Sequence, residues 1–440
     1  MHNKRILVVT FIDTIHPISK LNPFDNIGNN VFGNAINSYF FSKGINSTFI
    51  TYHQLWETLS KDNTWVDNNF DVAILAQMNL FIPHFLGEIN NLTYWLNFVH
   101  KPIFILGAGT ESTIDYSLDF LPLIQNQSNK LIDLIYSRGG QITARGEFTK
   151  EVLELMGAPN VFVSGCPSMY FNGPNFQVTN LKVASNEFIP IFNGKISTLI
   201  DYNNKYPNSK SAFYEQECFY YIIHEPENLT TRRYAYDISM LPNYDDSIIR
   251  NGLVKIFLNY KQWSDDIINS HANFSFGNRV HGNIIALLSG VPAFIDVKDS
   301  RTREIAEFYN IPNSIDIKYQ YSPETLYDLY SSLDWTKFNE NYKVKFEAFD
   351  QFLKKNNLIN TLKNNYEYKE QQSKLEFTYP SQESINQILD QYAKHTKRWA
   401  YFADHPFQKA MIRCVRALLP TKQMRDEFYI FACGSKNRYR

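Results

Sequence analysis

The chain reads Phe274-Ser-Phe-Gly-Asn-Arg-Val-His-Gly-Asn283 where a β-favouring run gives way to a helical one. The strand signal covers Ala272 to Phe276, and the apolar segment Ile284 to Leu288 follows Gly282 with helical spacing. This pattern predicts a strand, a loop and a helix. Backbone N–H groups at the start of a helix lack partners within it and lie at the positive end of the helix dipole. Such a junction therefore favours an anion.

Arg279 and His281 are two residues apart in this junction. Side chains at that spacing point the same way in an extended segment, whereas on a helix they diverge by roughly 200°. We therefore place both on the loop, facing one side. His281 is the best acid or base candidate because the intrinsic pKa of histidine lies near neutrality. The alternative is that His281 is a hydrogen-bonded structural residue, the commoner role for a single histidine after a strand.

Length and composition limit the classes of protein. A chain of 440 residues exceeds what one hydrophobic core usually serves, and 44% hydrophobic residues can fill more than one. The net charge of -1 gives no global attraction to nucleic acid. Four widely spaced cysteines without C-x-x-C spacing indicate reduced thiols and no zinc site. With no signal peptide and no membrane-spanning run, we expect a cytoplasmic protein.

Strands alternate with helices through the first half of the chain, which predicts a parallel sheet covered on both faces. The expected strands are 5–10, 47–52, 70–75, 102–106, 142–145 and 161–164, and the clearest helices are 32–41, 86–99 and 147–156. Gly107-Ala-Gly-Thr110 follows a strand end, where ligands gather in such sheets, so Gly109 is a candidate binding residue. Ser112 stands where a dinucleotide fingerprint needs its third glycine, which makes dinucleotide binding a weak alternative.

A second α/β region follows a polar linker at 172–186. We expect strands at 188–192, 219–223 and 291–297, and helices at 247–270 and 301–309. Beyond residue 320 the pattern is helical, at 323–333, 342–358 and 384–401. The predicted domains are 1–171 and 187–320, both Rossmann-like, and a helical extension, 321–440. Its basic end could lie on an anionic membrane surface, although a terminal helix docked on the protein with a solvated basic face is the preferred interpretation.

Four motifs, in their order along the chain, resemble the polysaccharide pyruvyl transferase family. The most specific is Asn278-Arg-Val-His-Gly282, followed by a helix of small residues and Gly290-Val-Pro292. The others are Asn26-Ile-Gly-Asn29, Ala144-Arg-Gly-Glu147 and Val163-Ser-Gly-Cys-Pro-Ser168. Gly146 departs from the pattern, because an acidic residue is expected after Arg145.

This resemblance implies two Rossmann-like domains in a GT-B-like arrangement. It implies phosphoenolpyruvate as the donor and a sugar diol as the acceptor, on a cell-surface glycan or its lipid-linked precursor. The product would be a pyruvate ketal. The residues themselves predict a reaction without a metal ion or cofactor, because there is no H-E-x-x-H motif and the pairs Asp245-Asp246 and Asp265-Asp266 lack the one-residue spacing of many metal sites. The catalytic residues would be His281 and Arg279. The substrate-binding residues would be Arg145, Asn278, Val280, Gly282, Asn283, Gly28, Asn29, Asn30 and Gly109.

Each assignment has a structural alternative. Arg145 could pair with Glu147 or Glu151. The segment Gly28 to Asn30 could form an ordinary turn, although a glycine there also lets the backbone approach a ligand. Asp299, Arg301 and Glu304 are expected to form a surface ion-pair cluster. His224-Glu-Pro226 and Arg232-Arg233 are expected to lie in a solvated loop rather than in the site.

Two functional alternatives also remain open. One is a GT-B glycosyltransferase, in which the same helix start and arginine would hold the diphosphate of a nucleotide-sugar. The other is a non-catalytic scaffold in a glycan-assembly complex. In that case replacing His281 or Arg279 would leave the cellular output of the protein unchanged. The sequence does not identify the acceptor sugar or the hydroxyl groups that are bridged.

Overall fold

The computed structural model describes residues 4–10, 26, 28–41, 45–179, 182–216, 219, 222–223, 238–241, 246–257, 260–359, 379–404, 420 and 424. The chain forms two compact units. The first holds strand β1 (Arg5–Thr10) together with the described residues of Asn26–Lys195 and Leu258–Glu376. The second holds the described residues of Ile196–Phe257 and Phe377–Arg440. The domain boundaries inferred from the sequence stay a prediction.

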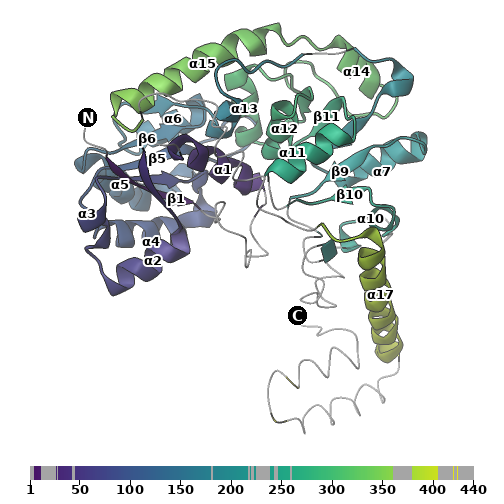
Figure 1. Cartoon of the computed structure of the whole chain (residues 1–440), viewed down its shortest axis with the longest axis horizontal. Helices are drawn as coiled ribbons and strands as arrows, with labels where there is room; N and C mark the ends of the chain where they lie inside the picture. The colour runs from purple at the N-terminus through teal and green to yellow at the C-terminus, as the bar shows by residue number, and fades with distance from the viewer. Residues whose placement is uncertain are drawn as a thin grey trace. The chain divides into compact units, whose positions relative to one another are not determined.

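The larger sheet of the first unit is parallel throughout. Its order is β2 (Asn46–Thr51), β1, β3 (Val72–Ala76), β5 (Ile103–Thr110), β6 (Gln141–Ala144) and β7 (Phe162–Val163), and β4 (Asn79–Phe81) pairs with the end of β5. Every residue of β3 and β5 is buried, as expected for strands covered on both faces. The surrounding helices are α1 (Gly28–Phe40), α2 (Tyr52–Lys61), α3 (Trp65–Asn69), α4 (Leu86–Leu96), α5 (Leu121–Ser137) and α6 (Glu147–Leu155) (Figure 1).

Three further parallel strands belong to the same unit. Strand β11 (Phe274–Gly277) pairs with β8 (Pro190–Phe192) on one side and with β12 (Ala293–Ile295) on the other. The helices α11 (Tyr260–Asn269), α12 (Val280–Leu288) and α13 (Ser300–Tyr309) accompany them. The expected α/β class, with parallel sheets and a helical C-terminal region, is confirmed.

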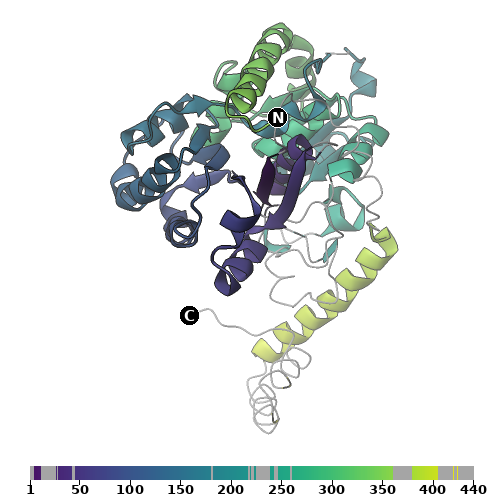
Figure 2. The same cartoon turned by 60° about the vertical axis from the view of Figure 1, so that its left-hand side comes forward.

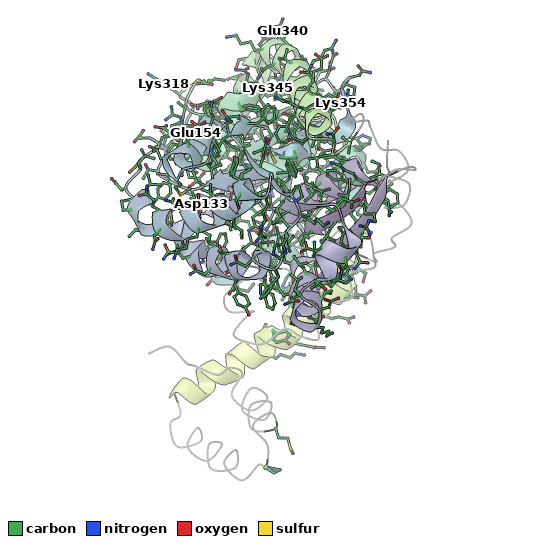
Figure 3. All side chains as sticks on the ribbon, turned by 90° about the vertical axis from the view of Figure 1, so that its left-hand side faces the viewer. Asp133, Glu154, Lys318, Glu340, Lys345 and Lys354 are labelled. Atoms are coloured by element: carbon green, nitrogen blue, oxygen red, sulfur yellow. The ribbon has the colours of Figure 1, made fainter. Side chains whose placement is uncertain are left out.

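Helix α15 (Thr336–Lys355), light green in Figures 1 and 2, packs into the first unit rather than extending from it. Its apolar face carries five buried aromatic residues: Phe338, Tyr342, Phe346, Phe349 and Phe352. The ring of Phe352 stacks on Phe162 of β7 with centroids 4.8 Å apart. Figure 3 shows its charged residues Glu340, Lys345 and Lys354 in the upper part of the view, with Glu340 at the edge. This amphipathic pattern explains why the helix forms where it does. The shorter α14 (Leu326–Ser332) precedes it.

The second unit contains a short parallel pair, β9 (Ala212–Tyr214) and β10 (Val254–Lys255), with α7 (Ile196–Lys205) and α10 (Ser247–Arg250). Helix α17 (Gln382–Asp404) is attached to α10 by polar contacts. Arg250 forms an ion pair with Asp390 at 2.9 Å, and the Gln382 amide donates to the Ile249 carbonyl at 2.7 Å.

Two expected elements are wrong. The single helix at 247–270 is instead α10, β10 and α11, because Gly252 adopts a left-handed backbone (φ +68°) that ends the first helical segment. The strand at 219–223 is wrong at Ile222 and Ile223, which are helical. Two expected loop motifs lie outside the described residues: His224-Glu-Pro226 and Arg232-Arg233. So does the C-terminal basic segment after Asp404, the end of α17, except for positions 420 and 424.

The turn from β11 into α12 depends on a network of buried amides. The Asn283 side chain donates to the Gly277 carbonyl at 2.9 Å and accepts from Asn193 at 3.1 Å and from Ser275 at 3.0 Å. The Asn283 N–H donates to the Arg279 carbonyl at 3.1 Å, which makes Arg279 the N-cap of α12. Gly277 lies so close to Asn193 that an added Cβ would overlap the Asn193 carbonyl oxygen.

Replacing Gly277 with alanine should therefore destabilise the protein by about 2 kcal/mol or more, because backbone atoms must move to admit the methyl group. Gly87→Ala is the matched control, since its Cβ would meet nothing within 4 Å. It should leave stability unchanged or raise it by up to about 1 kcal/mol. Denaturant unfolding of both variants checks this. Equal stabilities would contradict the account of the junction.

Candidate active site

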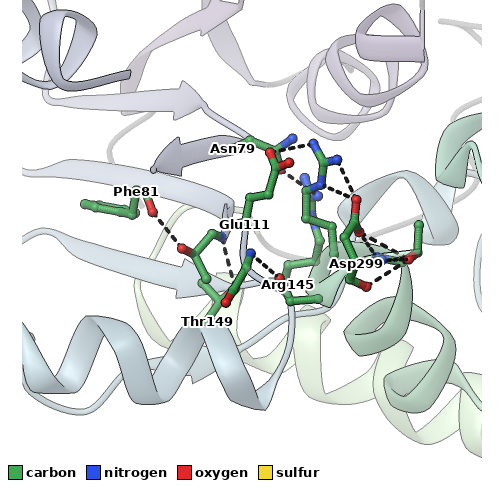
Figure 4. A network of polar contacts seen from close by, with 11 residues as sticks. Asn79, Phe81, Glu111, Arg145, Thr149 and Asp299 are labelled. Atoms are coloured by element: carbon green, nitrogen blue, oxygen red, sulfur yellow. Dashed lines mark hydrogen bonds and ion pairs between the residues drawn. The ribbon is translucent and has the colours of Figure 1, made fainter. Parts of the chain in front are cut away.

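Arg145 follows β6 directly and is 3% exposed. Its backbone N–H donates to Ala108 of β5 at 2.8 Å, and Nη1 donates to the Asn79 side chain at 2.9 Å. Gly109 leaves room for the guanidinium, since an added Cβ would lie 3.3 Å from Arg145 Cζ. Figure 4 shows Arg145 beside Asn79, Glu111 and Asp299. This is the carboxyl edge of the sheet, where ligands bind in open α/β folds.

The Arg145 guanidinium is incompletely paired. Its Nε and Nη2 have no hydrogen-bond partner among the described residues. The expected alternative, pairing with Glu147 or Glu151, is not seen there, and Glu147 pairs with Lys150 at 3.7 Å instead. Arginine stays charged in proteins, so a buried guanidinium with two unused donors is costly unless an anion completes it.

A second arginine lies at the start of α13. Arg301 forms ion pairs with Asp299 at 2.6 Å and with Glu111, which follows β5, at 3.0 Å. Asp299 also caps α13 by accepting from the Thr302 N–H at 3.0 Å. Burial alone would raise the pKa of Asp299, but Arg301 and Thr302 hold that pKa below its usual value.

Glu304 corrects one expectation. We predicted a surface ion-pair cluster from Asp299, Arg301 and Glu304, yet Glu304 is 2% exposed. Its carboxyl group accepts from Thr149 Oγ1 at 2.9 and 3.0 Å and from the Thr149 N–H at 3.2 Å. Burial raises the pKa of Glu304 to about 7, against the opposing effects of Arg145 and Thr149.

The missing acidic residue at position 146 is explained by the same carboxyl group. Gly146 is the N-cap of α6 and has no side chain to cap it. A Cβ there would lie 2.6 Å from Glu304 Oε2. Glu304 therefore caps α6 from another part of the chain, through Thr149, and the glycine makes space for it.

His281 lies in the first turn of α12, so its expected loop position is wrong. The helix begins earlier than the apolar run because the Asn283 N–H already bonds to the Arg279 carbonyl. His281 is 8% exposed; its Nε2 lies 3.8 Å from Cys166 Sγ and its ring meets the Phe32 edge. Burial, with the charges of Arg145 and Arg301, lowers the pKa of His281 to about 3. The imidazole is therefore neutral at neutral pH.

The cations that act on His281 are Arg145 and Arg301 rather than Arg279. Arg279 is half-buried at the N-cap of α12, and the shared orientation of Arg279 and His281 stays a prediction. Sequence reasoning missed Arg301 as a site residue. The available signal was its position at the start of a helix that follows a strand.

Tyrosine hydroxyl groups anchor the segment 164–173, which includes Cys166 next to His281. Tyr309 donates to the Cys166 carbonyl at 3.0 Å, and Tyr170 donates to the Ser164 carbonyl at 2.7 Å. Tyr342 of α15 donates to the Met169 and Gly173 carbonyls at 3.1 and 2.8 Å. Cys166 itself is buried and free, while Cys218, Cys414 and Cys433 lie outside the described residues.

The remaining predicted residues fall into two groups. Gly28, Asn29 and Asn30 form the first turn of α1, which packs against α12, and the Asn26 side chain accepts from the Gly28 N–H at 2.7 Å. The others surround the start of α12: Asn278, Val280, Gly282 and Asn283. Because Asn283 is fully buried in the junction network, its role is explained by structure, and its contact with substrate stays a prediction.

The family model for polysaccharide pyruvyl transferase matches residues 26–295, which is more than half of the chain. The chain belongs to this family. Residues Arg145 and His281 both fall within the matched span, whereas Asp299, Arg301 and Glu304 lie just beyond it. No curated protein matches the chain.

Solved structures resemble the pyruvyl transferase chain at low identity. An MnaA–UDP complex from S. aureus has a TM-score of 0.42 and 9% identity, covering 81% of this chain and 98% of its own. A UDP-GlcNAc 2-epimerase from Methanocaldococcus jannaschii, in complex with UDP-GlcNAc and UDP, has a TM-score of 0.43 and 12% identity, covering 80% and 99%. At these scores the likeness carries no conclusion about the substrate.

Two features are absent from the part of the chain that the structure describes. No helix in these ranges combines the length and apolar character that crossing a bilayer requires. No cluster of three or more His, Cys, Asp or Glu residues in the same ranges could hold a metal ion.

The depressed pKa of His281 should make folding sensitive to acid. Below pH 6.5 the unfolded chain binds a proton that the folded site resists until about pH 3, so stability falls as pH falls through this window. Glu304 acts in the opposite sense between pH 4.5 and 7, because its folded pKa is raised. The readout is therefore the difference between wild type and variant.

Relative to wild type, His281→Gln should gain up to about 1.4 kcal/mol of stability per pH unit as pH falls from 6.5 to 5. Unfolding curves at several pH values measure this gain. His84→Gln, which replaces an exposed histidine, serves as the control. A pH-independent difference for His281→Gln would contradict the buried, neutral imidazole.

Proposed function

We propose that the protein transfers a pyruvyl group from phosphoenolpyruvate to a sugar diol, forming a ketal on a capsule, exopolysaccharide or other surface glycan. Family membership supports the pyruvyl transfer. The single structural observation that carries the donor assignment is the buried Arg145 guanidinium with two unused donors. An anionic donor that accepts from both would remove the cost of burying them.

The donor carries a carboxylate and a phosphate on adjacent groups. The Nε and Nη2 of Arg145 form one edge of the planar guanidinium and suit two oxygens of one anion. The positive charges of Arg145 and Arg301 both disfavour protonation of the His281 imidazole. A donor with several negative charges would offset this charge and raise the pKa of His281 from its low value.

The reaction needs proton transfers that a neutral imidazole can assist. One acceptor hydroxyl adds to C2 of phosphoenolpyruvate while C3 gains a proton and becomes a methyl group. The C2–O bond to phosphate then breaks, and the second hydroxyl closes the ring on C2. The two acceptor hydroxyls lose two protons in total. One proton balances the new C–H bond at C3, and the other leaves with phosphate. We assign His281 as the base that receives a hydroxyl proton.

No cofactor or metal ion takes part in this proposal, in which the Arg145 guanidinium supplies positive charge to the departing phosphate. The acceptor is a glycan or a lipid-linked saccharide at the cytoplasmic face. Contact of the basic C-terminal segment with an anionic membrane is the corresponding peripheral proposal.

Donor identity is tested by thermal unfolding. Phosphoenolpyruvate should raise the melting temperature of the purified protein and UDP should not, because a ligand that binds only the folded state stabilises it. Phosphate release in the presence of acceptor glycan, with a mass gain on the glycan, then tests transfer. Protection by UDP but not by phosphoenolpyruvate would contradict the proposal and favour a nucleotide-sugar enzyme.

Replacing Arg145 with glutamine should lower kcat/KM for phosphoenolpyruvate by about 100-fold or more, since it removes a charge aimed at the donor. The matched control is Arg5→Gln, at the amino end of β1, where Arg5 pairs with Asp71 at 3.2 Å. That variant should retain its activity. An active Arg145→Gln protein would contradict the donor site.

Chelation should leave the rate unchanged. Phosphate release is measured directly in the protein as purified, with and without EDTA. A loss of activity that Mg²⁺ or Mn²⁺ restores would show that a metal ion takes part.

A further inference from the structure

A buried carboxyl group lies beside the residue that follows Arg145 in the chain. Glu304, from α13, reaches the backbone at Gly146, the residue that follows Arg145. Its hydrogen bonds from Thr149 Oγ1 and from the Thr149 N–H fix the carboxyl group at the start of α6. Both Glu304 and Arg145 are more than nine-tenths buried, so solvent screens their interaction only weakly.

These two groups form a buried pair of opposite charges that lacks direct contact. The donor atoms of Arg145 are left for a ligand, while Glu304 takes its hydrogen bonds from Thr149. In the empty site, an ionised Glu304 offsets the guanidinium charge. When an anion binds Arg145, the same carboxylate faces a second negative charge in a region of low polarity. Like charges so placed raise the pKa of a carboxyl group.

We propose that Glu304 is a proton-exchanging counterion for Arg145: a carboxylate when the site is empty and a neutral acid when an anionic donor is bound. The inference rests on the proposed function only in that Arg145 holds the anion. Glu304 is a positioning residue, because it acts through Arg145 and through the start of α6. Anion binding would then take up a proton, and affinity would fall as pH rises.

The groups around Glu304 agree with this role. Arg145 lowers its pKa and Asp299 raises it, with burial the largest cause of a value about 7. The nearby phenol is Tyr116, whose pKa is raised by burial first, then by Glu307 and to a smaller extent by Glu304. Strand β5 offers no titratable side chain, and on α15 the Lys345 ammonium lies over the Phe308 ring. Exchange is therefore expected near neutral pH.

The test uses sulfate, which stays a dianion across the range in which phosphate and phosphoenolpyruvate titrate. Its dissociation constant for the wild type, measured by calorimetry, should rise by up to about tenfold per pH unit between pH 7 and 8.5, as expected when one proton binds with each anion. Glu304→Gln keeps an acceptor for Thr149 and should bind sulfate with no such slope. Above pH 7 it should also bind more tightly than wild type.

Glu307→Gln is the matched control, because it removes an exposed carboxylate from the same helix. It should keep the wild-type slope. A wild-type slope in Glu304→Gln would overturn the proposal, as would a failure of sulfate to bind the wild type at any pH.

Should Glu304→Gln fail to fold, wild-type calorimetry at pH 8 in buffers of different ionisation enthalpy decides the matter. Uptake approaching one proton per sulfate supports the exchange, and no uptake overturns it. Proton-linked sulfate binding without pyruvyl transfer would defeat the proposed function alone. Pyruvyl transfer with an unchanged slope in Glu304→Gln would defeat this inference alone.

Discussion

Burial of the Arg145 guanidinium without a full set of acceptors is the constraint on which the rest of the site depends. An arginine side chain keeps its charge in this position, although only 3% of its surface is exposed to solvent. Asn79 satisfies one donor, Gly109 leaves room for the planar group, and two donors remain. The fold therefore holds a charge that is prepared for an anion before any ligand arrives, which is how electrostatic catalysis avoids reorganisation.

The loop after β5 fixes the groups that surround this charge. Ser112 and Ser300 exchange hydrogen bonds at 2.8 and 3.1 Å, and Arg303 donates to the Ile114 carbonyl at 2.8 Å. These contacts hold the start of α13 beside the end of β5, so that Arg301 can pair with Glu111. Residues from two separate βα connections thereby meet at one edge of the larger sheet.

The sequence predicts the parts of this arrangement that depend on local pattern. Continuous apolar runs, separated by helical segments, locate β1, β3, β5 and β6, because strands buried on both faces must be apolar throughout. The position of Arg145 follows from the end of such a strand.

Long-range packing decides the parts that the sequence could not provide. The charged run from Asp299 to Glu304 has the composition of an exposed helix, and only contact with Thr149 buries Glu304. Gly146 departs from the motif because the Glu304 carboxyl group occupies the space that a side chain at this position would fill. His281 lies in the helix rather than in the loop because the helix start is set by Asn283 and its buried partners, not by the apolar run after it.

The most direct test of the account is a crystal structure of the protein with phosphoenolpyruvate. We predict carboxylate or phosphate oxygens within hydrogen-bonding distance of both Nε and Nη2 of Arg145, with the donor close to His281. A donor bound elsewhere, or an Arg145 whose two nitrogens stay unpaired in the complex, would contradict it.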